Sequence, residues 1–397
     1  MAELAKLLEA CPDLPTEQVP LRDALGRVLA TEVHSLVDVP GFDNSAMDGY
    51  AVRAEDLSTS EPVELVVVGE QPAGLSRNLQ VSSGQAVRIM TGAPVPKGAD
   101  TVVQSEVTTE EDDIVTIQPS AKPGGNVRLT GEDTVKGDVI LTPGTKLGAR
   151  QLSAAASGGH EELTVYRSLR VGVVSTGDEL APPGAELRPG QIYESNSVLL
   201  AGLAGTLGAE VTTIAAVDDA GAGLVAALDE LAGNADVILM SGGVSVGRFD
   251  VVRNVLGVRA AARLTRVSIQ PGKPQGYALW EGTPILAFPG NPVSVFVSFM
   301  VFGAPFLRAR AGQEFRAPRT FAAIAGDGWK CPEGRRQFIP VRVEPQEGGV
   351  PVVYALLEGG SRSHLVTTMA SAEALGIVGE EVDRVKPGDQ IRLMEIL

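Results

Sequence analysis

The sequence predicts a multidomain α/β plus β protein, with a central α/β domain, a β-rich inserted domain and a C-terminal β-barrel-like domain. Three observations support this fold class. Strand-like and helix-like segments alternate between residues 169 and 311, short β-rich segments fill residues 39–135, and short strands return from residue 312 onward. Alternation of strands and helices is typical of a parallel sheet covered on both faces. At 397 residues the chain is also longer than one hydrophobic core usually supports.

Residues 1–38 and 136–168 predict a discontinuous linker domain. Apolar side chains at helical spacing predict helices over Ala2–Ala10 and Pro20–Ala30. The segment Val139–Val165 predicts a strand, a turn and a helix. Because this pattern stops near residue 39 and resumes near residue 136, we expect the intervening residues to be an insertion.

The inserted domain, residues 39–135, is expected to be all β. Its predicted strands are rich in β-branched residues and separated by Gly, Pro and acidic turns. They are Val63–Val68, Ala86–Met90, Thr101–Val107 and Ile114–Ile117. Two polar loops with apolar flanks, Asp43–Ala51 and Ile89–Pro94, are expected to contribute to a binding surface.

The α/β domain, residues 169–311, should hold the main ligand-binding edge. Its predicted strands are Val171–Val174, Val211–Val217, Val237–Met240 and Ile285–Phe288, and its predicted helices are Asn196–Leu207, Gly221–Ala232 and Val293–Leu307. In such sheets ligands bind beyond the carboxyl ends of the strands. We therefore expect the functional residues directly after the strands.

The C-terminal domain, residues 312–397, is predicted to be a small β-barrel or sandwich. Its short predicted strands include Arg335–Val343, Val350–Leu357 and Gln390–Met394.

Composition excludes several classes of protein. The net charge of −16 and the absence of a basic run argue against nucleic-acid binding. No signal peptide is recognisable, and the apolar run Pro292–Leu307 is too short to span a bilayer, so it predicts a buried helix. The two cysteines and three isolated histidines do not predict a zinc or haem site. We therefore expect a soluble cytoplasmic protein that binds neither membranes nor nucleic acid.

Three strand ends in the α/β domain carry polar, glycine-containing loops: Ser175–Leu180, Ser241–Gly247 and Pro289–Ser294. Glycines let backbone N–H groups approach a ligand, and a helix that begins beside them favours an anion. A phosphate-bearing ligand would suit this edge of the sheet. The predicted ligand-binding residues of these loops are Ser175, Thr176, Gly177, Ser241, Gly242, Gly243, Ser245, Pro289, Gly290, Asn291 and Pro292.

One of these loops also matches a different motif. Gly243–Gly247 has the G-x-S-x-G spacing of a hydrolase nucleophile elbow, with Ser245 at its centre. That mechanism needs an acid and then a histidine downstream, and His364 is the one histidine there, in a predicted separate domain. Ser245 is therefore not expected to be a nucleophile. The sequence also lacks the dinucleotide fingerprint and the P-loop.

Acidic residues gather at the same predicted edge. Glu179, Asp218, Asp219 and Asp250 lie at or just after strand ends, where carboxylates repel one another unless a cation compensates. A magnesium ion bridging a pyrophosphate would supply that compensation, with Glu179 and Asp250 as its expected ligands. Lys273, between two prolines of the segment Pro271–Pro274, is a candidate contact for a phosphate or an oxyanion.

These motifs, in order along the chain, resemble the molybdopterin molybdenumtransferase family, the MoeA-type enzymes that also supply the C-terminal part of gephyrin. The resemblance covers essentially the whole chain. It rests on Asp43–Ala51, Ile89–Pro94, Gly131–Asp133, Ser175–Leu180, Ser241–Asp250, Pro271–Pro274, Pro289–Ser294 and His364–Ala370.

The resemblance implies an enzyme that inserts molybdate into adenylylated molybdopterin and releases AMP in a magnesium-dependent reaction. The central α/β domain would bind the molybdopterin, whose own dithiolene supplies the sulfur ligands of the metal. The family is built as a homodimer of four-domain subunits, with the active site where the α/β domain of one subunit faces the insert of the other. Carried over by motif, the catalytic residues would be Asp48, Glu179, Asp219 and Asp250, and further contacts would be Thr91, Asp133, Lys273, Pro289 and Pro292.

The resemblance leaves some assignments open. It does not decide between Asp218 and Asp219, and the family pattern has a second basic residue where Gln270 stands. A molybdopterin adenylyltransferase would share the α/β loops, although the flanking domains argue against it. A gephyrin-like scaffold is the alternative from another class. The implied protein partners are the adenylyltransferase and molybdoenzyme apoproteins.

Overall fold

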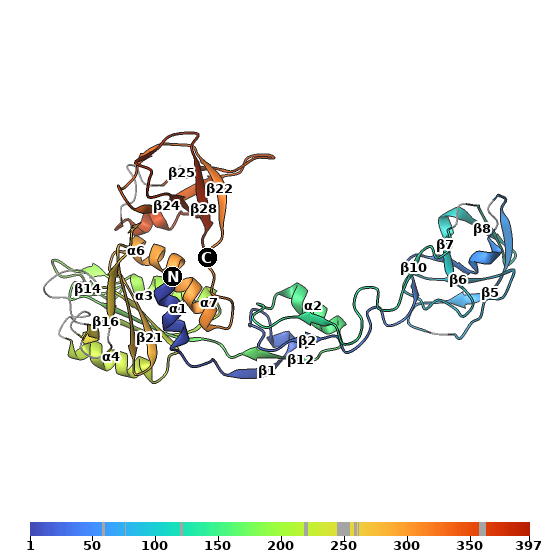
Figure 1. Cartoon of the computed structure of the whole chain (residues 1–397), viewed down its shortest axis with the longest axis horizontal. Helices are drawn as coiled ribbons and strands as arrows, with labels where there is room; N and C mark the ends of the chain where they lie inside the picture. Colours follow the sequence, from blue (N-terminus) through green and yellow to red (C-terminus); the bar gives the residue numbers. More distant parts are fainter. Residues whose placement is uncertain are drawn as a thin grey trace. The chain divides into compact units, whose positions relative to one another are not determined.

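The computed structural model describes residues 1–57, 60–75, 77–119, 122–217, 221–243, 255–257, 260, 262–356 and 363–397. The chain folds into two compact units (Figure 1). Unit 1 comprises Met1–Glu17, Gly26–Ala30 and Thr164–Leu397, and unit 2 comprises Gln18–Leu25 and Thr31–Leu163. This division is coarser than the four predicted domains, whose boundaries stay a prediction.

A six-stranded sheet forms the centre of unit 1, in the order β16-β13-β17-β21-β20-β18. Its strands are β16 (Glu210–Val217), β13 (Arg170–Thr176), β17 (Val237–Ser241), β21 (Thr283–Phe288), β20 (Pro274–Trp280) and β18 (Arg263–Arg266). The first four run parallel, and β20 and β18 add an antiparallel edge. The predicted α/β fold is confirmed.

Both faces of this sheet are buried, because successive strand residues point to opposite sides. In β17, Val237 and Leu239 join the core on one face, whereas Ile238 and Met240 join the core on the other. Helix α4 (Ala222–Ala232) packs on the second face. Helix α3 (Asn196–Thr206) and the segment 292–310 pack on the first.

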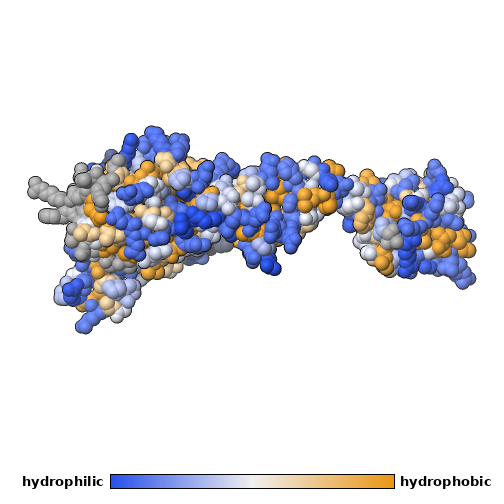
Figure 2. Space-filling view, turned by 90° about the horizontal axis from the view of Figure 1, so that it is seen from below, coloured by the Kyte–Doolittle hydropathy of each residue, from blue (hydrophilic) through white to orange (hydrophobic). Residues whose placement is uncertain are grey.

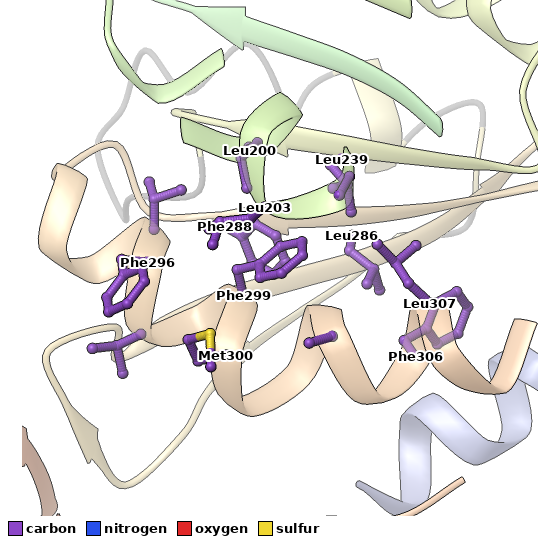
Figure 3. Packing of buried hydrophobic residues seen from close by; sticks show 14 of the residues in the cluster. Leu200, Leu203, Leu239, Leu286, Phe288, Phe296, Phe299, Met300, Phe306 and Leu307 are labelled. Carbon is purple, nitrogen blue, oxygen red and sulfur yellow. The ribbon is translucent and has the colours of Figure 1, made fainter. Parts of the chain in front are cut away.

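The segment 292–310 is one continuous helix of α6 (Pro292–Ser298), a π-helical turn η4 (Phe299–Gly303) and α7 (Ala304–Arg310). With 19 residues it is long and apolar enough to cross a membrane, so the expectation that it is too short is wrong, but 72% of its most apolar window is buried inside the protein. Figure 3 shows its Phe299 packed with Phe288 of β21 and with Leu200 and Leu203 of α3. The helix therefore serves as a core helix of unit 1, as predicted.

The N-terminal helix prediction is correct at one segment and wrong at the next. Helix α1 (Ala2–Glu9) buries Leu4 and Leu7 in the core of unit 1. The expected helix over residues 20–30 does not form; strand β1 (Thr16–Pro20) is followed by a short 3-10 turn, η1 (Leu21–Asp23), and then by non-helical chain. Its backbone groups pair elsewhere: the Ala30 amide donates to the Thr164 carbonyl (2.9 Å). Partners distant in sequence replace the bonds that a helix would make within itself.

Residues 320–395 form a closed five-stranded barrel. Its strands are β22 (Thr320–Ala325), β24 (Arg336–Glu344), β25 (Val352–Ala355), β26 (Ala374–Val378) and β28 (Gln390–Glu395). The barrel closes because β24 pairs with both β25 and β26. The two-residue strand β19 (Ile269–Gln270) adds to β24 in parallel. Smaller elements of unit 1 are β14 (Leu180–Ala181), β15 (Ile192–Tyr193), β23 (Trp329–Lys330), β27 (Arg384–Val385) and α8 (Val366–Met369), and β12 (Glu162–Tyr166) has residues in both units.

Unit 2 holds a six-stranded sheet in the order β7-β4-β6-β5-β9-β8. Its strands are β4 (Gly49–Val52), β5 (Val63–Gln71), β6 (Gln85–Ile89), β7 (Thr101–Gln104), β8 (Thr108–Glu111) and β9 (Ile114–Ile117). The four strands predicted for the insert are confirmed, except that the predicted strand Thr101–Val107 ends at Gln104 and its last three residues form a 3-10 turn. Short elements complete the unit: β2 (Val33–His34), β3 (Asn44–Ser45), η2 (Ala54–Asp56), η3 (Ser105–Val107), β10 (Val127–Arg128), β11 (Val139–Leu141) and α2 (Ala149–Ser157).

Candidate functional site

Three parallel strands of unit 1 end at the same level of the sheet. Ser175 of β13 lies opposite Ser241 of β17, and Ser241 lies opposite Phe288 of β21. The loops that follow these strands therefore leave the sheet side by side, and two of the loops touch directly. This is the carboxyl edge at which ligands collect in open α/β sheets.

Glycine is required where these loops meet. Gly242 has a φ of +94°, and a Cβ placed on it would lie 2.5 Å from the Thr176 carbonyl oxygen. Its amide donates to the Phe288 carbonyl (3.2 Å). A Cβ on Gly290 would lie 3.7 Å from the Gly242 Cα. Glycine is therefore needed at Gly242, whereas the 3.7 Å approach at Gly290 is an ordinary van der Waals contact.

A buried polar network lies beneath these loops. The Ser175 hydroxyl donates to the Glu194 carboxylate (2.9 Å), and its oxygen lies 2.9 Å from the Ser241 hydroxyl oxygen. Glu194 is only 1% exposed. Glu194 was not predicted from the sequence; its signal is the polar segment Glu194–Ser197, which leads into the first turn of α3.

Two further buried side chains at this edge have unused hydrogen-bonding capacity. Neither Thr176 Oγ1 nor Asn196 Oδ1 has a partner among the described residues. Asn196, which the sequence analysis also missed, donates from Nδ2 to the Gly290 carbonyl (2.7 Å). Buried polar atoms are usually paired, so each of these two oxygens can accept a further hydrogen bond.

Glu179 and Lys273 supply opposite charges in exposed loops. A Cβ on Gly177 would lie 2.7 Å from the Glu179 carboxylate oxygens, so that carboxylate folds back over its own loop. Lys273 is exposed in the turn before β20, where its carbonyl accepts from the Val267 amide (2.9 Å). Neither side chain forms an ion pair within the described part of the chain.

Several predicted site residues lie outside the described residues: Asp218, Asp219, Ser245 and Asp250. Among the residues that are described, no group of three His, Cys, Asp or Glu side chains could hold a metal ion. The magnesium site is therefore still a prediction, because Asp250, one of its two expected ligands, belongs to the undescribed part.

The C-terminal motif meets the third loop of the edge. Asn291 donates from Nδ2 to the Ser363 hydroxyl (3.1 Å), and the Val293 amide donates to the Ser363 carbonyl (3.0 Å). Helix α8, inside the predicted motif His364–Ala370, contacts α6. His364 itself is exposed in a turn. The polar loop Pro289–Ser294 is therefore held from the barrel side by a residue that the sequence analysis did not single out.

Unit 2 carries the other predicted residues. Asp48 precedes β4 and accepts from both the amide (2.6 Å) and the hydroxyl (2.9 Å) of Thr91. These two hydrogen bonds hold the pKa of the Asp48 carboxyl below its usual value. Asp43 has the same relation to Thr130. Asp133 is exposed, and its amide donates to the Val39 carbonyl (3.0 Å).

We expect Thr91→Ala to raise the pKa of Asp48 toward its ordinary value while the backbone bond keeps it somewhat depressed. The pKa of Asp48 is depressed because the folded protein stabilises its ionised form. The ionised carboxylate therefore stabilises the fold at pH values above the ordinary pKa, and this contribution is lost as pH falls through the depressed value. Protonation of Asp48 should begin at higher pH in the variant. A carboxyl-carbon NMR titration measures this directly.

Thr130→Ala is the matched control, because it removes the same kind of hydroxyl from Asp43. It should shift Asp43 and leave Asp48 unchanged. An Asp48 titration that does not respond to Thr91→Ala would contradict this account.

Family models identify the class of protein. The MoeA N-terminal region (domain I and II) matches residues 1–159, a probable molybdopterin binding domain matches residues 172–309, and the MoeA C-terminal region (domain IV) matches residues 322–396. The chain is thus built from the three regions of a MoeA-type protein.

Full-length relatives define the family further. The chain is 41% identical to molybdopterin molybdenumtransferase 2 of Mycobacterium tuberculosis, over 99% of this chain and 97% of the relative. It is 37% identical to the molybdopterin molybdenumtransferase of Haemophilus influenzae, over 98% and 96%. The chain belongs to the molybdopterin molybdenumtransferase family.

A solved structure shares the fold. The molybdopterin biosynthesis MoeA protein from Pyrococcus horikoshii OT3 matches with a TM-score of 0.84 at 30% identity, over 100% of this chain and 99% of that chain.

Proposed function

We propose that this protein is a molybdopterin molybdenumtransferase, which inserts molybdate into adenylylated molybdopterin and releases AMP and the finished molybdenum cofactor. The observation that carries the proposal is the full-length 41% identity to a relative of that name. The edge of the sheet in unit 1 is consistent with it, because glycine backbones and hydroxyl groups gather there beside one lysine turn and one acidic loop.

The described residues suit the handling of anions. Backbone amides around Gly242 and Gly290 and the hydroxyl of Thr176 can bind phosphate or molybdate oxygens, and Lys273 can offset their charge. We propose that Asp48 and Thr91 also take part in the reaction. Their hydrogen bonds fix the carboxylate in one orientation, which is what positioning a reacting group requires.

We propose that magnesium binds at Glu179 and Asp250. Glu179 fits a hard cation, because it is an exposed carboxylate with no ion-pair partner among the described residues. Bound magnesium would offset the negative charge of the pyrophosphate during release of AMP. We also propose that Asp219 is catalytic and that Asp133 and Ser241 bind the substrate.

The function is tested by single turnover of adenylylated molybdopterin with molybdate and magnesium, measuring AMP and the activity of a reconstituted molybdoenzyme apoprotein. We expect AMP and active cofactor to appear together and to depend on molybdate. Formation of adenylylated molybdopterin from ATP would instead identify an adenylyltransferase, which the family models for residues 1–159 and 322–396 do not favour. We propose that the protein works in the cytoplasm, between that adenylyltransferase and the apoproteins.

We further propose a homodimer, and expect light scattering after gel filtration to give about twice the chain mass of 41.3 kDa. Among the described residues 20 large apolar side chains are exposed, and 12 of these belong to unit 2, although unit 1 is the larger unit. Figure 2 shows hydrophobic patches within its hydrophilic surface. Six of these residues lie in or beside the strands and loops that lead into the insert: Leu36, Val37, Phe42, Leu129, Val135 and Val139.

Exposed apolar surface of this kind is typical of protein interfaces. Leu36→Glu with Val135→Glu should therefore shift the protein toward the monomer mass. A fully active wild-type monomer at micromolar concentration would contradict the dimer proposal.

A further inference from the structure

Glu194 is a carboxylate buried without a cation. It lies directly before α3 and is 1% exposed. Its Oε1 accepts from the Ser175 hydroxyl (2.9 Å) and from the Ser197 amide (2.8 Å), and its Oε2 accepts from the Ser197 hydroxyl. No ion pair to it occurs among the described residues. Burying a carboxylate is costly, and apolar groups often serve stability as well or better.

Glu194 lies at the junction between the carboxyl ends of β13 and β17. Ser175 and Ser241 are cross-strand partners in β13 and β17, and their hydroxyl oxygens lie 2.9 Å apart. Both are almost completely buried. Thr176 and Gly242 each come one residue later, and a Cβ on Gly242 would lie 2.5 Å from the Thr176 carbonyl oxygen. Fixing the two hydroxyls therefore fixes the starting points of both loops.

The same turn also reaches the third loop. Asn196 donates from Nδ2 to the carbonyl of Gly290 (2.7 Å). The segment Glu194–Ser197 thus bonds directly to the end of β13 and to the loop after β21, and it reaches the end of β17 through Ser175. A helix cap alone would require neither the bond to Ser175 nor the bond to Gly290.

We propose that Glu194 is a positioning residue for the molybdenum insertion reaction, acting through Ser175 and Ser241 on the loops that hold the substrate. This proposal rests on the proposed function and adds a residue to it. Glu194 does not touch the substrate. Its hydrogen bonds set the positions, relative to each other, of the loops after β13 and β17, whose backbones must bind the same anionic ligand. A displacement of about 1 Å at such a site can lower the rate roughly 100-fold.

Asp236 provides a matched control at the opposite edge of the same sheet. It is also a largely buried carboxylate, and it accepts from Arg167 in a bidentate pair (2.8 Å each) and from the Arg170 amide (2.8 Å). Burial is the largest single influence on the pKa of Asp236 and raises it. The hydrogen bonds from Arg167 and Arg170 together outweigh burial and hold this pKa below its usual value. Its contacts are far from the ligand loops, so its loss should affect stability alone.

The test compares Glu194→Ala, Glu194→Gln, Ser175→Ala, the double variant Glu194→Ala with Ser175→Ala, and Asp236→Asn. Glu194→Ala should lower kcat/KM about 10- to 100-fold. Glu194→Gln should recover most of it, because the amide oxygen can accept from Ser175 and the Ser197 hydroxyl can turn to accept from the amide nitrogen. The double variant should be no worse than the poorer single variant. Asp236→Asn should lower the melting temperature and leave kcat/KM unchanged.

Hydrogen exchange of the free protein supplies a reading that does not depend on activity. Peptides covering residues 172–180 and 238–243 should exchange faster in Glu194→Ala and near the wild-type rate in Glu194→Gln. If the wild type does not insert molybdenum, the proposed function fails, while the exchange data still decide whether Glu194 holds the loops.

Three outcomes would overturn the proposal: additive losses in the double variant, a Gln variant as defective as the Ala variant, or Glu194→Ala with wild-type turnover and exchange. If Glu194→Ala does not fold, Ser175→Ala alone carries the test. Normal turnover and exchange in that variant would then refute positioning through Ser175.

Discussion

Gly242→Ala is expected to reduce molybdenum insertion by at least about 100-fold, the scale of loss when reacting groups are misplaced by an ångström. The added Cβ would meet the Thr176 carbonyl oxygen at 2.5 Å and Thr176 Oγ1 at 2.9 Å. The positive φ of +94° adds backbone strain. Since the obstructing atoms include backbone at the end of a buried strand, the loop must move, and its amide loses its bond to Phe288. Single-turnover release of AMP measures the effect.

Gly208→Ala separates the strain from the collision. Gly208 has a similar φ of +88°, but a Cβ there would meet nothing within 4 Å. Its variant should lose about 1 kcal/mol or somewhat more of stability, as expected for an ordinary residue in the left-handed region, and keep its activity. Equal activity losses in the two variants would show that the close approach of the loops is not what matters.

Glu179→Gln is expected to lower turnover roughly 100-fold or more, the size of effect typical for loss of one positioned charge or acid-base group. The change preserves shape and removes the negative charge that we assign to magnesium. Because Glu179 is exposed and has no ion-pair partner among the described residues, the melting temperature should stay the same or rise slightly. The magnesium concentration needed for half-maximal rate should increase.

Glu186→Gln is the control for this variant, since Glu186 is an exposed acid a few residues further along the same loop region. It should leave both rate and magnesium dependence unchanged. Wild-type turnover in Glu179→Gln, or its failure to fold, would show that Glu179 is structural. Asp250→Asn should behave like Glu179→Gln if both hold the same ion.

The sequence was most informative where its periodicity was simple. Apolar β-branched runs such as Val237–Met240 specify strands buried on both faces, and the position of Ser241 after such a run predicts a loop at the ligand edge. The convergence of three loops followed from strand direction alone. The segment Pro20–Ala30 failed because its apolar spacing also fits a helix, while long-range backbone pairing, as at Ala30, decides the outcome.

The residues that were missed depend on contacts distant in sequence. Glu194 is an acidic residue before a helix, and nothing in its local pattern indicates that its carboxylate is buried against Ser175 of another strand. Ser363 likewise becomes relevant only because the barrel brings it to Asn291. The assignments of Asp219, Ser245 and Asp250 are still sequence predictions, because these residues lie outside the described part of the chain.

The two-residue strand β19 makes the position of Lys273 depend on the barrel as well as on the central sheet of unit 1. Ile269 and Gln270 pair with Arg336 and Gln337 of β24, and Lys273 follows three residues after Gln270, directly before β20. The turn that carries Lys273 is thus connected to the barrel through β19 and to the central sheet through β20. A change of register in β24 would therefore displace the ammonium group of Lys273. The positive charge at the ligand edge thus depends in part on barrel residues that do not contact the ligand.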